Sequence, residues 1–510
     1  MITISDLSTI EEGSAPSFVN FIRGQRRARL YLRSGIIISL LLVAIFKFFY
    51  PYPNLVFDSY YYIKAAAQNA NVNAWPIGYS KFLWIFGWFS HSPLWLVIFQ
   101  YLFLQFCNGL FFFTLLYFYR PGTVITNILF CFLFLNPLFL YLSNLIMADA
   151  LFTGLSILWI TQLLWIIFRP RSYMVLTHAL LLLITFSVRY NALYYPLVAA
   201  LAFILCRQQI WLKLAGIAVQ FILLGGFILY TSNRVADLTG ERQFSPFGGW
   251  KVANDALFMY AHIQPEKGDL PPEKFRSLDH LVQRYFAYTH DNGDLMRRDQ
   301  FWGSYYMFDN MSPLVQYMLR QDSTDNGFIN SKRWAAMAPL YAAYGSWLIR
   351  KYPTAYARYF LWPNTIRYVI PTLEIFQALS PFYLRDDDLG IPARDWFGLR
   401  TLTPQPFYIN LRTYIFSYYP IINLLILLAF ILGGIGFLLL KGWRKVSRPI
   451  LYSMILICTL WLGNLCFNVI AAAVVFRYLV FIMVVGFAFS LLLLEFIYQH
   501  LDKSEVPKVE

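Results

Sequence analysis

Charge is scarce in this sequence, and so is cysteine. Charged residues make up only 13% of the 510 residues, about half their usual share in soluble domains. Hydrophobic residues make up 58%. This imbalance excludes a soluble multidomain enzyme and indicates a multi-pass integral membrane protein. All five cysteines lie in apolar segments, so no disulfide framework is predicted: Cys107, Cys131, Cys206, Cys458 and Cys466.

Several motifs that would signal a function are missing. There is no GxxxxGK[ST] loop, which argues against ATP-driven transport by this chain. There is no HExxH motif, the six histidines have no metal-ligand spacing, and Ser and Cys nucleophile motifs are absent. The net charge of +14 does not indicate nucleic acid, because the basic residues lie in short loops expected to face the cytoplasm.

Apolar runs along the chain predict about ten transmembrane helices, since about twenty apolar residues cross a bilayer. The first run ends in FKFFYPYPN without a small-residue cleavage site, so it is predicted to be an uncleaved span with its N-terminus inside. The intervening basic loops and the tail 499–510 then fall on the cytoplasmic side. The predicted spans are 34–50, 93–118, 123–142, 148–168, 173–188, 191–206, 211–231, 414–440, 449–470 and 476–498.

Two predicted outside segments are more than connectors. Residues 51–92 contain the stretches DSYYYIKAAAQNA and YSKFLWIFGWF, which are too short to span and are expected to lie in the membrane interface. Residues 232–413 hold most of the acidic residues and are expected to form a mostly helical outside domain. The predicted organisation is a cytoplasmic segment (1–33), helices 1–7 (34–231), the outside domain (232–413) and helices 8–10 (414–498). The fold class is all-α, in the inner (plasma) membrane.

Two carboxylates are placed where chemistry is possible. Asp58 follows the first span, at the start of an interfacial stretch, where weak solvation can raise a carboxyl pKa toward that of a useful base. Asp149 lies in LSNLIMADALFTGL at an outer span end, where a charge is costly unless it faces the bundle interior or water. For each, a helix N-cap is an equally strong interpretation.

Two arginines stand at predicted outer ends of spans, where the positive-inside bias disfavours them. They are Arg189 and Arg477, each followed directly by a tyrosine, Tyr190 and Tyr478. A guanidinium at this boundary suits a bidentate contact with phosphate or carboxylate. The alternative is snorkelling to lipid headgroups.

Four motifs in order along the chain resemble one family. FDSYYYIKAA followed by WPIGYSKFLWIFGWF, then MADALF, then FRYLVF, resemble segments of the GT-C class of membrane glycosyltransferases. This class includes the protein O-mannosyltransferases and the aminoarabinose transferase of lipid A. The resemblance covers roughly residues 34–210 and the last span, whereas the outside insert is unmatched.

The resemblance implies a GT-C-like bundle that transfers a sugar from a polyprenyl-phosphate donor on the outer face. Asp58 would then be the catalytic base and Asp149 a supporting acid. Two departures from the family pattern are Ser59, where many members have a second acid, and Trp75, where the aminoarabinose transferase has a lysine that Lys81 could replace. The implied donor-phosphate contacts are Arg189, Arg477 and Lys81, and the implied substrate-lining residues are Tyr62, Tyr79, Tyr190 and Tyr478.

A phosphate leaving group is already a stable anion, so one base suffices for inverting transfer, whereas glycoside hydrolases need two carboxylates. The sequence requires no cofactor, identifies no metal ligands and leaves dependence on a divalent metal open. The sugar and the acceptor, whether glycan, lipid or protein, also stay open. The rival interpretations are a transporter or flippase of lipid-linked saccharide, although the paired halves with broken helices typical of transporters are not visible, and a noncatalytic assembly subunit.

Overall fold

The computed structural model describes residues 16–265, 270–291, 303–321, 332–373, 391–398 and 409–501. Within these ranges every regular element is a helix, and extended pairing is limited to two isolated bridges, Asn54–Leu145 and Thr372–Val475. The all-α prediction is confirmed for this part of the chain. Residues 1–15, the tail beyond 501 and five stretches of the predicted outside domain lie outside the described residues.

Eight helical segments in the described residues are long and apolar enough to cross a bilayer, so a multi-pass membrane protein is supported. One of them is broken at Asn136, the residue before Pro137. The Asn136 side chain accepts a hydrogen bond from Leu138 N. The segments are α2 (Arg26–Phe49), α5 (Pro93–Tyr119), α6 and α7 (Thr123–Phe134, Pro137–Asn144), α8 (Ala148–Phe168), α11 (Ile210–Thr239), α21 and α22 (Ile409–Phe416, Tyr419–Leu439), α23 (Arg448–Ala471) and α24 (Val480–Leu501).

Two of the ten predicted spans are shorter than a full crossing. The segment predicted at 173–188 is α9 (Met174–Val188), and that at 191–206 is η2 (Tyr190–Tyr194) with α10 (Tyr195–Leu205). At 1.5 Å per residue, the 15 residues of α9 extend about 22 Å, less than the roughly 30 Å of a hydrocarbon core. Ten full-length spans are therefore not confirmed.

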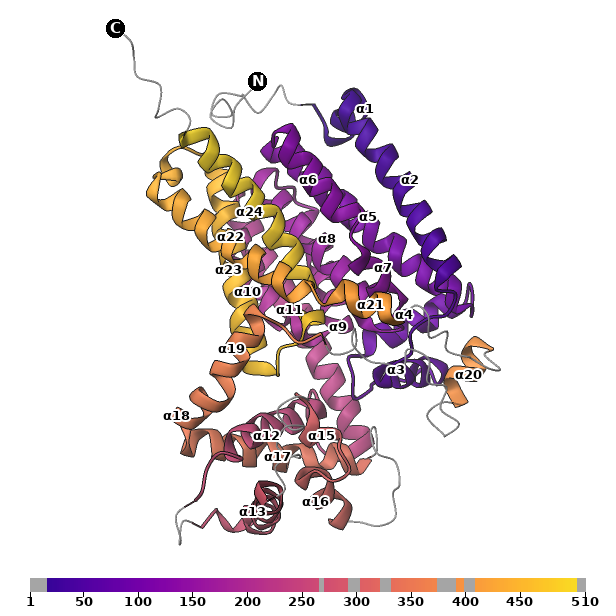
Figure 1. Cartoon of the computed structure of the whole chain (residues 1–510), viewed down its shortest axis with the longest axis vertical. Coiled ribbons are helices and arrows are strands. Elements are labelled where there is room, and N and C mark those ends of the chain that lie inside the picture. The colour runs from indigo at the N-terminus through magenta and orange to yellow at the C-terminus, as the bar shows by residue number, and fades with distance from the viewer. Residues whose placement is uncertain are drawn as a thin grey trace.

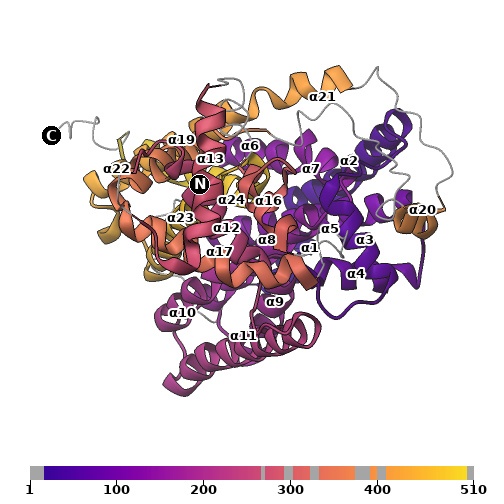
Figure 2. The ribbon, with the colours of Figure 1, turned by 90° about the horizontal axis from the view of Figure 1, so that it is seen from below.

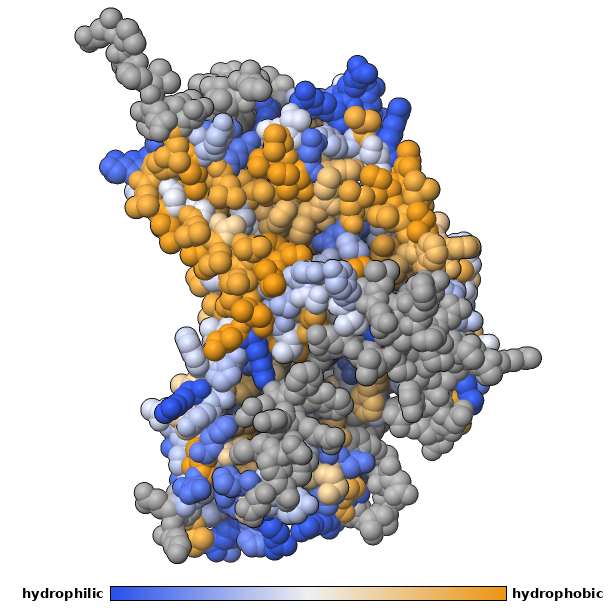
Figure 3. Space-filling model, in the orientation of Figure 1, coloured by the Kyte–Doolittle hydropathy of each residue, from blue (hydrophilic) through white to orange (hydrophobic). Residues whose placement is uncertain are grey.

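The starts of α2 and α6 and the end of α24 lie at one end of the bundle, opposite α12 (Pro246–Tyr260) and α17 (Lys332–Lys351) (Figure 1). Arg27, at the start of α2, donates from Nη1 to Thr123 Oγ1 at the start of α6, over 3.1 Å. Gly122 N, beside that start, donates to Glu495 Oε1 near the end of α24, over 2.6 Å. Figure 3 shows an apolar band between this end and the polar domain. Which end faces the cytoplasm stays a prediction.

Both short amphipathic stretches after the first span are helical, as predicted. They are α3 (Phe57–Ala67) and α4 (Ile77–Gly87), and they contact each other. The short helix α20 (Ile391–Phe397) packs against α3, and Figure 2 shows α3, α4 and α20 together on one side of the molecule. Their position in a membrane interface stays a prediction.

The described helices from α12 to α19 build a helical domain beyond the apolar band (Figures 1 and 3), which we call the outer domain. Its largest contact is between α12 and α17. Its described elements are α12 (Pro246–Tyr260), η3 (Glu273–Phe275), α13 (Arg276–Asp291), α15 (Tyr305–Phe308), α16 (Pro313–Gln321), α17 (Lys332–Lys351), α18 (Pro353–Tyr356), η4 (Ala357–Leu361) and α19 (Trp362–Val369).

Small residues let α12 and α17 approach closely. A Cβ on Gly249 would collide with the backbone of Ala338, and one on Gly345 would lie 2.6 Å from Val252 O. Pro339 lies inside α17 and cannot donate to the carbonyl of Ala335. Gln243 Nε2 donates to that carbonyl instead, over 2.8 Å. The pair is therefore fixed by backbone proximity as well as by side-chain packing.

We expect Gly249→Ala to lower the stability of the outer domain by about 1–3 kcal/mol, because the added methyl group forces α12 and α17 apart. Gly248→Ala is the matched control, since no atom lies within 4 Å of its added Cβ and alanine favours a helix by about 1 kcal/mol. Thermal unfolding of the two purified variants measures the difference. Equal melting temperatures would contradict close helix contact at Gly249.

A buried ion pair lies on α12. Lys251 Nζ lies 3.2 Å from Asp255 Oδ1 and donates to Gly303 O over 2.7 Å. Burial raises the pKa of Asp255 from 3.8 to about 6, although Lys251 and Asn254 act in the opposite direction. The folded protein therefore holds a proton on Asp255 more tightly than the unfolded chain does.

From this linkage, outer-domain stability is expected to be greatest below pH 4 and to fall by roughly 3 kcal/mol as the pH rises through 6. Amide hydrogen exchange of α12 between pH 4 and 8, corrected for the intrinsic rate, measures this change. Asp255→Asn should remove it, whereas Asp237→Asn, at an exposed carboxylate, should keep it. A pH dependence that survives in Asp255→Asn would assign the effect to another group.

Candidate functional site

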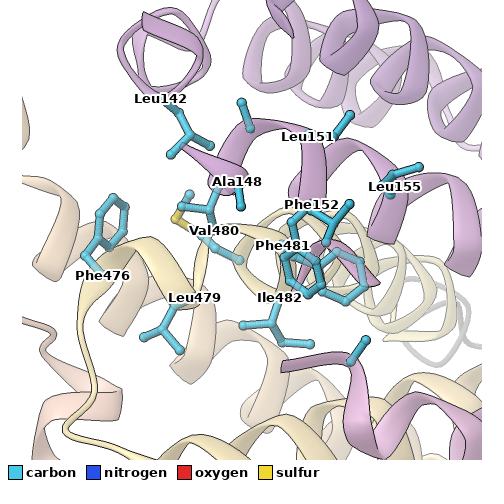
Figure 4. Packing of buried hydrophobic residues seen from close by; sticks show 14 of the residues in the cluster. Leu142, Ala148, Leu151, Phe152, Leu155, Phe476, Leu479, Val480, Phe481 and Ile482 are labelled. Atoms are coloured by element: carbon cyan, nitrogen blue, oxygen red, sulfur yellow. The ribbon is translucent and has the colours of Figure 1, made fainter. Parts of the chain in front are cut away.

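Apolar packing brings two distant chain segments together. Figure 4 shows side chains from the start of α8, among them Ala148 and Phe152, beside side chains from η8 (Phe476–Tyr478) and the start of α24, among them Val480 and Phe481. All four are buried. Since Asp149 and Arg477 lie within this packed region, burial of apolar surface places the two charged residues close together.

The connection that carries Asp58 is fixed to the connection that carries Asp149. Asn54 N donates to Asn144 O over 2.8 Å, and Ile146 N donates to Asn54 O over 3.0 Å, which forms the first isolated bridge. Lys47 Nζ donates to Asn144 Oδ1 over 2.9 Å. The two acids are thereby set at the same end of the bundle.

The connection that carries Arg477 is fixed in a similar way. Phe476 N donates to Thr372 O over 2.9 Å, within the second isolated bridge. The buried Asn364 donates from Nδ2 to Ala472 O over 2.7 Å and accepts from Val474 N over 3.1 Å. Both bridges in the described residues therefore lie within a few positions of a charged candidate residue.

Neither candidate acid is a helix N-cap. The N-cap position of α3 is Val56, whose N–H donates to Ser59 Oγ over 3.0 Å, so Ser59 organises this helix start. The N-cap position of α8 is Met147. Asp58 and Asp149 lie two residues after these N-cap positions, within the first helical turn, where the helix dipole favours a negative charge. The N-cap interpretation is wrong for both, and the carboxylates turn to arginines instead.

Two acids and two arginines form one charge cluster. Arg477 Nη1 lies 3.4 Å from Asp58 Oδ2 and 3.7 Å from Asp149 Oδ2. Arg189 Nη1 pairs with Asp149 Oδ1. The side chain of Asp149 is 1% exposed, whereas those of Asp58, Arg189 and Arg477 are 21%, 12% and 13% exposed. Asp149 is therefore the buried partner of both arginines, and the side chains of the other three residues are partly exposed.

Tyr478 supports both guanidinium groups. The Cζ atoms of Arg189 and Arg477 lie 4.8 Å and 5.1 Å from the centre of its ring, and its hydroxyl accepts from Arg477 Nη2 over 3.4 Å. Cation–π contacts of this kind hold arginines in place without neutralising them. Tyr478 is predicted to line a substrate. Its contacts with Arg189 and Arg477 also orient these two cations.

Two other predicted tyrosines are buried beneath the cluster. Burial raises the pKa of Tyr62, which lies in the field of all four charged residues, so its phenol stays protonated. Tyr79 is fully buried, packs edge-on against Tyr62 and donates to Gln100 Oε1 over 2.8 Å. Gln100 in turn donates to Ser143 O. These tyrosines tie α3 and α4 to the bundle.

The remaining two predicted residues are not brought into the cluster. Lys81 Nζ donates to Asn69 O and Oδ1 over 3.2 Å and 2.7 Å, beyond the C-terminal end of α3, whereas Asp58 lies at its N-terminal end. The 11 residues of α3 separate these ends by about 16 Å. Tyr190 packs on Phe244, with ring centres 4.5 Å apart.

A hollow of about 840 Å³ opens beside α3. Its lining includes Lys64 and Gln68 of α3, His91 and Trp396, and none of the four clustered residues. Within the described ranges no three His, Cys, Asp or Glu side chains converge to hold a metal ion. The chemistry available at the cluster is that of one exposed carboxylate beside two guanidinium groups.

Sequence reasoning missed the residues that position the cluster: Lys47, Asn54, Asn144, Asn364 and Thr372. Their side chains or backbones act across 90 or more positions of sequence, so no local pattern predicts them. A buried lysine near the end of an apolar run was the one available signal, because such a charge requires a partner.

Comparisons with family models, with curated proteins and with solved structures found no match to this chain.

The Asp149–Arg189 pair is expected to couple strongly to stability. Asp149→Asn and Arg189→Gln should each destabilise the protein by roughly 3 kcal/mol, because each leaves a partly buried charge without its partner. The double variant should cost less than the sum of the two by at least about 1 kcal/mol. Thermal unfolding of all four proteins tests this, and additive losses would contradict a direct pair.

Proposed function

We propose that the protein is an inverting, GT-C-type glycosyltransferase that moves a sugar from a polyprenyl-phosphate donor to an acceptor at the outer face of the membrane. The observation that carries this proposal is the 3.4 Å separation between Asp58 Oδ2 and Arg477 Nη1 in a cluster with exposed edges. A base and a phosphate-binding cation are needed side by side in such a reaction. The proposed setting is the inner membrane, with both termini cytoplasmic.

The proposed step has a simple balance of atoms. Asp58 takes the proton of an acceptor hydroxyl as its oxygen attacks the anomeric carbon and forms the new glycosidic bond. The bond from that carbon to the phosphate oxygen breaks, its electron pair leaves with polyprenyl phosphate, and the configuration inverts. Arg477 and Arg189 stabilise the charge that grows on the departing phosphate. Asp149 keeps both arginines oriented toward the departing phosphate.

In the structure the proposed base is paired with a proposed phosphate contact, Arg477. A donor phosphate competes for that guanidinium and frees the Asp58 carboxylate to accept a proton. Asp149 retains its contacts with both arginines, so the cluster keeps a negative anchor when the donor binds. Donor binding before acceptor activation is the order that this geometry favours.

An apolar path adjoins the cluster. Arg189 is followed by η2 and α10, on which Leu193 and Leu197 are exposed, and Ile470 at the end of α23 is exposed as well. Helix α23 contacts both η2 and α10. A prenyl chain held against these side chains would place its phosphate at Arg189, which supports a lipid-linked donor over a soluble nucleotide sugar.

Asp58→Asn is expected to reduce transfer at least a thousandfold while donor binding persists, because the amide cannot take the acceptor proton. Incubation of the purified protein with labelled prenyl-phosphate sugars and envelope extract measures release of free prenyl phosphate. Asp237→Asn removes an exposed carboxylate outside the cluster and should keep wild-type activity. An arm with chelator tests the requirement for a divalent metal.

The same assay separates the rival functions. A flippase would move the labelled donor across the bilayer of a vesicle and release no free prenyl phosphate. A noncatalytic subunit would neither move the labelled donor nor release free prenyl phosphate. In that case, cells carrying Asp58→Asn would keep their envelope glycans unchanged. Wild-type turnover by Asp58→Asn would remove the proposed base.

A further inference from the structure

A second hollow, separate from the charge cluster, lies on the outer domain and is basic. It measures about 790 Å³ and opens between the C-terminal half of α17 and the η3 segment. No acidic residue is among those that line it. Its charged and aromatic lining consists of Lys274, Phe275, Trp347, Arg350 and Lys351.

Two of the cations of this hollow, Lys274 and Lys351, lie over aromatic rings. Lys274 Nζ lies 4.8 Å from the centre of the Phe275 ring, and Lys351 Nζ lies 4.8 Å from that of Trp347. In the part of the chain that the structure describes, no carboxylate lies within ion-pair distance of Lys274 or Arg350. The positive charges of Lys274 and Arg350 are therefore left for a ligand.

Helix capping does not account for this arrangement. Arg350 and Lys351 lie in the last turn of α17, where the helix dipole favours cations. Lys274 comes from a different element, just ahead of α13, where the dipole disfavours a cation. A cation at position 274 therefore costs stability, and Lys274 lies with the other cations at a hollow large enough for a ligand. This combination is typical of a binding site.

We propose that this hollow binds a phosphate- or carboxylate-bearing segment of the acceptor. Anion binding follows from the hollow itself, whereas its assignment to the acceptor rests on the proposed glycosyltransferase function. Arginine and lysine together suit such groups.

The geometry of α17 links the hollow to the charge cluster. At its N-terminal end, the Trp334 ring lies 6.4 Å from Phe247, which lies 6.2 Å from Trp75 beside α3. Arg350 is 16 residues further along α17, about 24 Å at 1.5 Å per residue. An acceptor that occupied both sites would be an extended chain, with its anionic part far from the reacting hydroxyl.

The test uses the full-length protein in detergent, with tripolyphosphate as the probe. Lys274→Gln/Arg350→Gln is expected to weaken binding at least tenfold. Lys332→Gln/Arg320→Gln, which removes two exposed outer-domain cations away from the hollow, should bind as the wild type does. Since both double variants lose the same charge, equal affinities or no binding by the wild type would overturn the proposed site.

Two further arms identify the ligand. In the transfer assay, Lys274→Gln/Arg350→Gln should raise KM for the acceptor about tenfold with kcat nearly unchanged, and an unchanged KM would overturn the assignment to the acceptor. Nanodiscs of anionic lipid should leave tripolyphosphate binding intact, and loss of binding there would assign the hollow to headgroups. Asp58→Asn should keep the probe affinity, so failure of the proposed reaction is distinguishable from failure of this site.

Discussion

The contact of Asp149 with both Arg189 and Arg477 is the interaction on which the rest of the site depends. Three segments far apart in sequence, at 147–152, 185–189 and 472–478, are packed together where one almost fully buried carboxylate forms ion pairs with two guanidinium groups. A buried charge of this kind is costly unless it is paired, so the bundle must close around it in one arrangement. Asp58 joins the group from a fourth segment, at the exposed edge.

The lengths and order of the helices were largely predictable from apolar runs, and the residues that close the site were not. Asp58, Asp149, Arg189, Arg477 and Tyr478 could be found from the sequence because a charge or ring at a span end is conspicuous. The N-cap interpretation failed at both acids, since Ser59 occupies the backbone N–H at one helix start and tertiary ion pairs hold both carboxylates. Contacts such as Asn364 with Val474 depend on folding across more than a hundred residues, which no periodicity reveals.

The outer domain is built on a different principle from the bundle. Its two main helices are brought together by glycines, with backbone nearly touching backbone, and its buried Asp255 is paired with Lys251 on the same helix. The aromatic contact between Trp75 and Phe247 joins it to the connection after α3. A ligand bound on this domain could therefore affect the charge cluster through a short chain of rings.

The shortness of α9 has a consequence for the surrounding lipid. A helix of about 22 Å is shorter than a hydrocarbon layer of roughly 30 Å, and thinning of the nearby leaflets is one way in which a bilayer accommodates a short crossing helix. Because Arg189 directly follows α9, it would lie where the bilayer is thinnest. Lipid headgroups there would sink toward the guanidinium, and a membrane-anchored phosphate would reach it without leaving the leaflet.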